Sequence, residues 1–204
     1  MNESGPRRAN RMAELFSEEE RDYLVSLRRA LHRNPELSWR EERTAAVLEE
    51  ALHWAGAVGV RRVAGTGVVG SIPGSQRSTH RVAVRGDIDA LPIQEANSIP
   101  FASEIPGVMH ACGHDVHAAW TVGAALLLRR QPALYDTTVV LQPAEEVGEG
   151  ARAILESGAL DGVAAIFGGH VDRRFDVGEV VVQPGPMAAA ADTFRVVLLG
   201  KGAH

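Results

Sequence analysis

Cysteine is almost absent from this sequence, since Cys112 is the only one in 204 residues and a single thiol cannot form an internal disulfide. The opening segment MNESGPRRANRMAELFSEEE lacks the apolar core of a secretory signal. The chain also lacks the run of roughly 18 apolar residues that a membrane span needs. These absences exclude a disulfide-stabilised secreted scaffold and predict a cytoplasmic protein without a membrane partner.

An excess of positive charge is also missing. Lys and Arg total 21 against 26 Asp and Glu, which gives a formal net charge of −5, and no long basic run occurs. Nucleic-acid binding depends on a basic surface, so a nucleic-acid partner is not expected and a small-molecule partner is. The 45% of hydrophobic residues is enough for one good-sized core.

The apolar periodicity predicts two helices followed by alternating strands and helices. Ser17 and Glu20 match a capping box that opens a helix ending near Asn34. Ser38 is expected to open a second helix that ends at Gly56. We predict further helices at about 115–130 and 150–156, and strands at 58–63, 67–72, 81–86, 137–142, 163–168, 179–183 and 192–200. This order predicts an α/β fold with a mixed, largely parallel sheet flanked by helices.

Acidic residues and a histidine follow three of the predicted strands directly. Asp87 and Asp89 follow one strand, Glu145 and Glu146 follow the next, and His170 follows a third. The carboxyl ends of parallel strands form the crevice in which ligands bind, so these groups are expected to converge. For the two aspartates alone, the capping of a turn explains the pattern equally well.

Two neighbouring carboxylates at the end of a buried strand repel each other unless one binds a cation or holds a proton. The pair Glu145 and Glu146 occupies such a position. In a hydrolytic metal site, one carboxylate holds the ion while its neighbour takes a proton from water. The pair therefore favours a metal-dependent hydrolase.

The segment MHACGHDVHAAW, residues 109–120, holds the cysteine and three of the eight histidines. On a regular helix Cys112 and His114 would point about 200° apart, but Gly113 between them favours a turn that lets both reach one ion. Thiolate and imidazole suit zinc most readily, and also cobalt, nickel and manganese. A buried, inert thiol is the alternative for Cys112. His117 is expected to support a ligand or contact substrate, whereas the remote His32, His53 and His80 are interpreted as surface or hydrogen-bonded polar residues.

Five ordered motifs together resemble the M20 family of metallopeptidases and amidohydrolases. They are RGDIDALPIQE (85–95), PGVMHACGHDVHAA (106–119), LQPAEEVGEGARAILESGAL (141–160), the glycine-flanked His170, and GPMAAAADTFRVVLLGKGAH (185–204). The chain looks like the branch that hydrolyses N-acyl amino acids, hippurate and auxin conjugates, and LRRALHRNPELSWRE (27–41) is similar to the N-terminal signature of that branch. The similarity runs from about Ser17 to the last residue.

The resemblance implies a site with two divalent metal ions, zinc, manganese, cobalt or nickel. The residues that match the family's metal ligands are Cys112, His114, Glu146 and His170. Glu145 matches the general base and Asp89 the orienting aspartate. Because the wider family has a histidine ligand at the position of Asp87, the role of Asp87 stays open. His204 matches a lid-domain histidine that stabilises the oxyanion in a neighbouring subunit, which implies a homodimer in the full-length form.

The function implied is amide-bond hydrolysis of N-acyl amino acids by metal-activated water, with Glu145 as the general base. The fold implied is a zinc-peptidase-like catalytic domain. We expect a loose N-terminal leader at 1–16, the N-terminal portion of the catalytic domain at 17–186, and the start of a lid and dimerisation domain at 187–204, truncated there.

Two alternatives accompany this interpretation. In the first, the chain is a truncated fragment that binds metal and turns nothing over. In the second, Cys112 is the nucleophile of a thiol hydrolase with a nearby histidine as base. The segment GGHVDRRFDVG also lacks the proline-bearing stretch that commonly follows the histidine in this branch, which leaves the substrate contacts there open.

Overall fold

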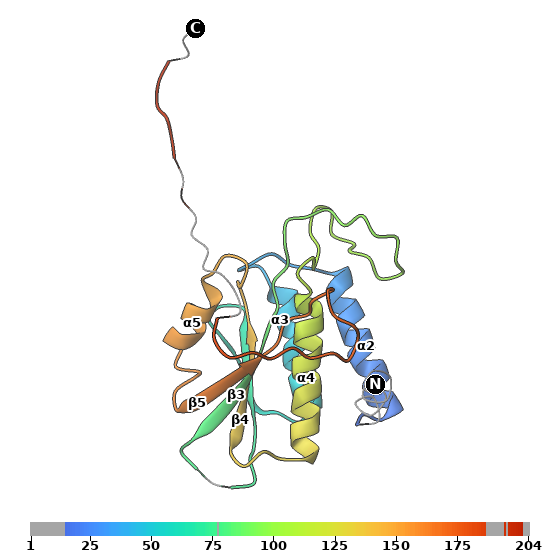
Figure 1. The fold of residues 1–204 in the computed structure, drawn as a ribbon, viewed down its shortest axis with the longest axis vertical. Coiled ribbons are helices and arrows are strands. Elements are labelled where there is room, and N and C mark those ends of the chain that lie inside the picture. Colours follow the sequence, from blue (N-terminus) through green and yellow to red (C-terminus); the bar gives the residue numbers. More distant parts are fainter. Residues whose placement is uncertain (1–14, 77, 187–193, 195, 202–204) are drawn as a thin grey trace.

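A five-stranded sheet in the order β1-β2-β4-β3-β5 forms the centre of the molecule in the computed structural model. The structure describes residues 15–76, 78–186, 194 and 196–201. Helices α2, α3 and α4 cover one side of the sheet and α5 lies on the other (Figure 1). The elements are α2 (Glu18–Arg33), α3 (Glu42–Trp54), β1 (Val58–Val63), β2 (Gly67–Ile72), β3 (Arg81–Asp87), α4 (His114–Arg130), β4 (Asp136–Gln142), α5 (Gly150–Glu156) and β5 (Val163–Gly168).

Four strands of the described sheet run in one direction and β2 opposes them. The hairpin partner β1 and the neighbour β4 both pair with β2 in antiparallel register, whereas β3 pairs with β4 and with β5 in parallel register. The predicted α/β fold with a mixed, largely parallel sheet is therefore confirmed. Because β4, β3 and β5 are parallel neighbours, their carboxyl ends lie side by side at one edge.

Both faces of the central strands are apolar because both faces are covered. Val139 and Leu141 of β4 pack in the core beneath α2, α3 and α4, while Val140 between them packs with Ile154 of α5 on the other face. Alternate side chains of a strand point to opposite faces, so a continuous apolar run is what a strand between two layers requires.

The start of α2 confirms the predicted capping box. The Ser17 hydroxyl accepts a hydrogen bond from the Glu20 amide at 3.1 Å, and the Glu20 carboxylate accepts one from the Ser17 amide at 2.8 Å. Two amide groups that the first turn leaves without helical partners are thereby satisfied. None of the described helices combines the length and apolarity that crossing a bilayer needs.

The predicted start of α3 was wrong. This helix begins at Glu42, and Ser38 does not cap it. The Ser38 hydroxyl instead donates to the Asp89 carboxylate at 2.7 Å. This tertiary hydrogen bond replaces the helix cap that the local pattern predicts. The predicted end is confirmed, since Gly56 follows the helix with φ +83°, a left-handed conformation that glycine adopts most readily.

The two last predicted strands are not formed in the part of the chain that the structure describes. Residues 179–183 have no strand partner, and Val180 and Val182 are 82% and 85% exposed. Residues 194 and 196–201 are also outside any strand, while the remainder of 192–200 lies outside the described residues. A valine-rich run forms a strand only where a neighbour supplies backbone hydrogen bonds, and β propensity does not replace that neighbour.

Candidate metal centre

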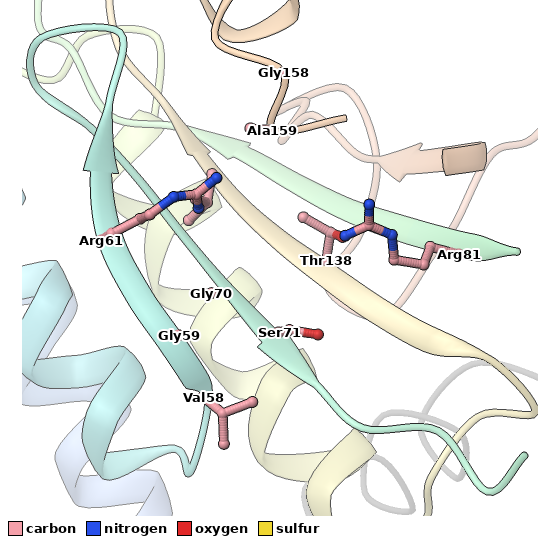
Figure 2. Close-up of a pocket in the computed structure, with 10 residues that line it drawn as sticks. Val58, Gly59, Arg61, Gly70, Ser71, Arg81, Thr138, Gly158 and Ala159 are labelled. Atoms are coloured by element: carbon pink, nitrogen blue, oxygen red, sulfur yellow. The ribbon is translucent and has the colours of Figure 1, made fainter. Parts of the chain in front are cut away.

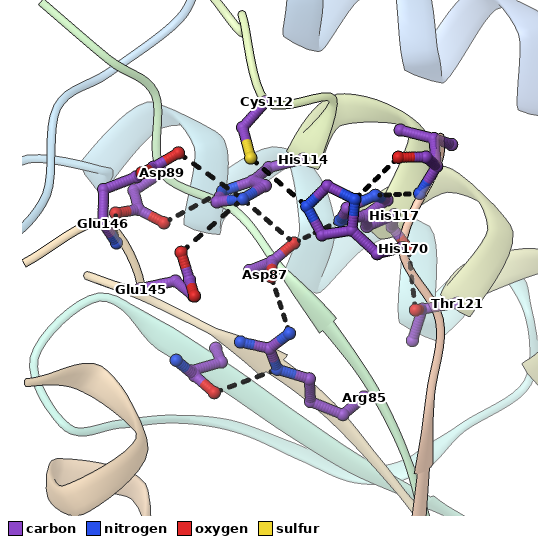
Figure 3. A network of polar contacts seen from close by, with 12 residues as sticks. Arg85, Asp87, Asp89, Cys112, His114, His117, Thr121, Glu145, Glu146 and His170 are labelled. Atoms are coloured by element: carbon purple, nitrogen blue, oxygen red, sulfur yellow. Dashed lines mark hydrogen bonds and ion pairs between the residues drawn. The ribbon is translucent and has the colours of Figure 1, made fainter. Parts of the chain in front are cut away.

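Side chains from three strand ends and from the first turn of α4 point to one place at the carboxyl edge of the sheet (Figure 3). The Cys112 Sγ lies 3.2 Å from His170 Nε2. His114 Nε2 lies 3.7 Å from a Glu146 oxygen and 3.8 Å from a Glu145 oxygen. The structure thus brings together the residues predicted from separate motifs, which are Asp87, Asp89, Cys112, His114, Glu145, Glu146 and His170.

Three groups of potential ligand atoms each lie within 4.8 Å of one another, and His114 belongs to all three. The groups are Cys112, His114 and His170; His114, Glu145 and Glu146; and Asp87, His114 and His117. Because the three groups overlap at His114, all of these ligand atoms surround one position at the sheet edge.

Gly113 makes the turn between Cys112 and His114. It is the N-cap of α4 with φ +93°. A Cβ on this residue would lie 2.5 Å from Val171 Cγ2, so the position excludes a side chain as well as favouring a left-handed residue. The predicted turn is confirmed, and it presents the Cys112 thiol and the His114 imidazole to the same cluster.

Two histidines turn one ring nitrogen towards the centre of the cluster. His114 Nδ1 is 3.2 Å from an Asp89 oxygen, and its Nε2 is buried without a hydrogen-bond partner. His170 Nδ1 donates to the Val171 carbonyl at 2.7 Å and leaves Nε2 facing Cys112. Metal-binding histidines use one nitrogen in this way, donating it to a carboxylate or carbonyl, while the other binds the ion.

The donor set fits a divalent transition metal. His114 Nε2 and Glu146 Oε1 are both buried without a partner, and each such atom costs about 1–3 kcal/mol when it is left unsatisfied. Sulfur, imidazole nitrogen and carboxylate oxygen are the ligands that zinc and its neighbours accept. A cation between these atoms would satisfy both of them.

The electrostatics of the cluster also suit the binding of a cation. Burial and the charge of Glu146 raise the pKa of Cys112 to about 12. Burial and the repulsion from Glu145 and Asp89 raise the pKa of Glu146, although His114 opposes the shift. The pKa of His114 is raised too, because its hydrogen bond with Asp89 and the charge of Asp87 outweigh the lowering by burial. A bound cation would act in the opposite direction on the thiol and the carboxylate, because it favours their deprotonated forms.

Asp87 and His117 are engaged with other protein groups beside the cluster. One Asp87 oxygen is 2.6 Å from Arg85 and the other is 2.6 Å from His117 Nδ1. Burial raises the pKa of Asp87, but the His117 hydrogen bond and the Arg85 charge outweigh it and lower that pKa to about 2. His117 Nε2 accepts a hydrogen bond from the Val171 amide at 3.0 Å. Asp87 is therefore an ionised carboxylate that holds His117.

The remaining predicted histidines lie away from the cluster. His32 is buried with both nitrogens hydrogen-bonded, to Asp115 at 2.8 Å and to Glu95 at 3.2 Å, while His53 and His80 are exposed. Their interpretation as satisfied or surface polar residues is confirmed. His204, the predicted lid histidine, lies outside the described residues.

Sequence reasoning missed Glu41. This carboxylate is fully buried and accepts hydrogen bonds from the Thr66 hydroxyl at 2.6 Å and from the Ala144 amide at 2.9 Å. Ala144 precedes the Glu145–Glu146 pair and has φ +49°, unusual for alanine. The motif around Glu41 was visible in the sequence, but its partners lie 25 and 103 positions away and no local pattern reveals them.

A separate hollow of about 280 Å³ lies over β1 and β2, between the side chains of Arg61 and Arg81 (Figure 2). The Arg81 guanidinium donates to the Asp161 carbonyl. No residue that lines this hollow belongs to the metal-ligand groups, so the candidate site is the cluster at the sheet edge.

Fold and cluster together define a class: α/β proteins with a candidate divalent-metal centre at the carboxyl edge of the sheet. Residues 83–197 match the model of peptidase family M20/M25/M40. This match covers more than half of the 204 residues, and the chain belongs to that family.

Named relatives agree with the predicted family. The chain is 44% identical over 188 residues to the N-acetylcysteine deacetylase of Bacillus subtilis, a match that covers 89% of this chain and 48% of the relative. It is 43% identical over 185 residues to the IAA-amino acid hydrolase ILR1-like 4 of Arabidopsis thaliana, covering 90% and 42%. The family resemblance inferred from the motifs is confirmed.

A solved structure shares the fold. The Bacillus subtilis YXEP protein, described as a dinuclear metal binding peptidase from the M20 family, superposes with a TM-score of 0.73 at 42% identity. The match covers 76% of this chain and 44% of that one. The chain spans about half the length of the relatives it matches.

Proposed function

We propose that this chain carries the metal centre and general base of an amidohydrolase that cleaves the amide bond of N-acyl amino acids with two divalent metal ions. The observation that carries the proposal is that His114 lies in one group of close ligand atoms with Cys112 and His170 and in another with Glu145 and Glu146. Relatives named as an N-acetylcysteine deacetylase and an IAA-amino acid hydrolase support the substrate class.

Four residues would hold the metal: Cys112, His114, Glu146 and His170. Bound there, divalent ions supply Lewis acidity, which makes water acidic enough to lose a proton near neutral pH and polarises a carbonyl. Asp89 supports two of the ligands, because one of its oxygens holds His114 Nδ1 and the other accepts the Glu146 amide at 3.0 Å.

The exposure of the two glutamates separates their proposed roles. The Glu146 side chain is 19% exposed and the Glu145 side chain 41%. The more buried carboxylate is suited to holding an ion, and the more open one to exchanging a proton with water and substrate. Glu145 accepts a proton from water as the water oxygen bonds to the amide carbon. It then gives that proton to the amine nitrogen as the carbon–nitrogen bond breaks.

The test compares Glu145→Gln with wild type, and Glu156→Gln, an exposed residue of α5, is the matched control. Metal content by elemental analysis should stay unchanged in Glu145→Gln, while release of amino acid from N-acetyl, N-benzoyl and indole-acetyl amino acids should fall by roughly 100-fold or more. Normal turnover in Glu145→Gln would refute the assignment. Cleavage of unblocked dipeptides instead would redirect the proposal to peptidase activity.

The thiol-hydrolase alternative conflicts with the state of Cys112. A thiol whose pKa is about 12 has almost no thiolate at neutral pH, and the thiolate is the nucleophile. Chelation should abolish turnover and metal should restore it. The fragment alternative is decided by turnover of the 204-residue chain alone, since an inactive fragment would bind metal and release no product.

We further propose that 17–186 form the N-terminal portion of the catalytic domain, that 187–204 begin a lid domain, and that the full-length protein is a homodimer. His204 of one subunit would then stabilise the oxyanion in the other. Mixed dimers of the variants Glu145→Gln and His204→Ala should regain activity, because one of the two sites then contains both residues. Separate monomers in sedimentation would contradict the dimer.

A further inference from the structure

His117 is a buried histidine beside the cluster to which the hydrolytic proposal gives no task. It lies in the first turns of α4, its side chain is fully buried, and each ring nitrogen has a different partner (Figure 3). Nδ1 is 2.6 Å from an Asp87 oxygen, and Nε2 is 3.0 Å from the Val171 amide nitrogen.

These partners determine which nitrogen carries the proton. A backbone amide can only donate, so His117 Nε2 must be the acceptor with its lone pair towards Val171. The Asp87 carboxylate can only accept, so Nδ1 carries the hydrogen. Asp87 is in turn held by Arg85 at 2.6 Å, and this guanidinium also donates to Gln142 at 3.0 Å. These hydrogen bonds fix the tautomer of His117, with the hydrogen on Nδ1 and the acceptor at Nε2.

The residue that His117 holds is the one next to His170. Val171 is fixed from a second side by Gly113, where its Cγ2 occupies the space that a Cβ would need. The His117 ring also stacks on Trp120 with centroids 4.8 Å apart, which prevents it from turning away. The loop that leaves β5 is therefore attached to α4 at Val171, one residue after the proposed ligand.

We infer that His117 is a positioning residue: by accepting the Val171 amide hydrogen it aims His170 Nε2 at the site beside Cys112. The inference rests on the proposed function, because it concerns a ligand of the proposed metal centre. It assigns His117 to the alignment of His170 and not to coordination. Coordination by His117 would require Nε2 to abandon Val171 or Nδ1 to abandon Asp87.

Two substitutions separate the two hydrogen bonds of His117. In His117→Gln the side-chain oxygen reaches the place of Nε2 and still accepts from Val171. In His117→Asn the amide nitrogen stands near Nδ1 and still donates to Asp87, but nothing accepts from Val171. His53→Asn, an exposed histidine of α3, is the matched control.

Zinc affinity by calorimetry and the visible spectrum of the cobalt-loaded chain give the readout. His117→Gln should bind within about threefold of wild type, whereas His117→Asn should bind roughly 10- to 100-fold more weakly, the usual effect of losing a group that orients a ligand. Adding His117→Asn to His170→Ala should cost little more than His170→Ala alone, since both act through one imidazole. Equal losses of zinc affinity in His117→Gln and His117→Asn, each adding to the loss in His170→Ala, would identify His117 as a ligand and overturn the inference.

Nitrogen-15 spectra of the metal-free chain test the geometry independently of metal binding. They should show His117 protonated at Nδ1, a coupling across the hydrogen bond from the Val171 amide to Nε2, and loss of that coupling in His117→Asn. A ring protonated at Nε2 would overturn the inference. If the wild-type chain binds no metal, the proposed function fails, and the spectra alone decide whether His117 holds the His170 loop.

Discussion

A fully buried carboxylate such as Glu41 persists only where its oxygens are hydrogen-bonded, because burial removes the water that would otherwise solvate it. Both of its oxygens have partners, the Thr66 hydroxyl and the Ala144 amide. Ala144 has a left-handed backbone, which costs about 1–2 kcal/mol for a residue with a Cβ. Glu41 thus holds the strained residue that precedes Glu145.

Replacing Glu41 tests this support. Glu41→Leu should lower the free energy of unfolding by about 2–4 kcal/mol, because it leaves a buried amide and a buried hydroxyl without partners. Glu41→Gln should lose less, since its oxygen still accepts from Ala144 and its amide can donate to the Thr66 hydroxyl. Urea unfolding of both variants measures the difference. Equal stability of the two would show that the hydrogen bonds contribute nothing.

Gly113 offers a second test at a single residue. Gly113→Ala should lower the free energy of unfolding by about 1–3 kcal/mol, since it imposes a left-handed strain and a contact with Val171. Because Val171 holds the neighbouring His170 in place, zinc affinity should fall as well. Gly107→Ala, which has φ +75° and open space around its Cβ, is the control for strain without contact. Identical zinc affinity in both variants would contradict the role of the contact.

Among the elements, α2 is joined to the start of α4 by a buried ionic network. His32 of α2 donates to Asp115 and Glu95, and the Arg28 Nε lies 2.7 Å from Asp115. Both acceptors are carboxylates whose pKa is lowered, by hydrogen bonds and nearby charges that outweigh burial. The hydrogen bond with Asp115 raises the pKa of His32 despite its burial. Folding therefore favours the protonated form of His32, and His110 is the other histidine facing it.

This bridge predicts a pH dependence of stability. A histidine whose pKa is raised by folding stabilises the fold fully below its unfolded pKa of about 6.5, and the contribution is lost as pH rises through the raised value. The stability difference between wild type and His32→Gln should therefore be largest at about pH 5–6 and shrink at higher pH. Urea unfolding at a series of pH values measures it. A constant difference would show that folding does not raise the pKa of His32.

Most elements could be predicted from the sequence because their signals are local. Ser17 and Glu20 are three residues apart and cap their own helix, and the apolar runs of β3 and β4 are buried on both faces. The predictions were wrong where the local structure depends on a partner far away in the sequence. Ser38 binds Asp89 rather than α3, and residues 179–183 find no neighbouring strand in the described structure.

At the scale of the whole molecule, the parallel order β4-β3-β5 unites ligands from distant segments, so metal binding should stabilise the fold as a unit. Saturation at 100 times the dissociation constant should raise the free energy of unfolding by about 2.7 kcal/mol. The chain with Cys112→Ser and His114→Ala should show no such rise. Urea unfolding with and without zinc measures both, and an equal rise in the two chains would place the binding elsewhere.

The sequence by itself determined the kinds of element and the chemistry available at their ends, because helix caps, strand alternation and residue type act over a few positions. Tertiary structure alone decided which ring nitrogen of His114 and of His170 faces the cluster, that Asp87 pairs with Arg85 and His117, and that Glu41 supports Ala144. The physical reason is that a hydrogen bond requires its two atoms within about 3 Å. For groups far apart in the chain, only the register of the sheet and the packing of helices against it set that distance.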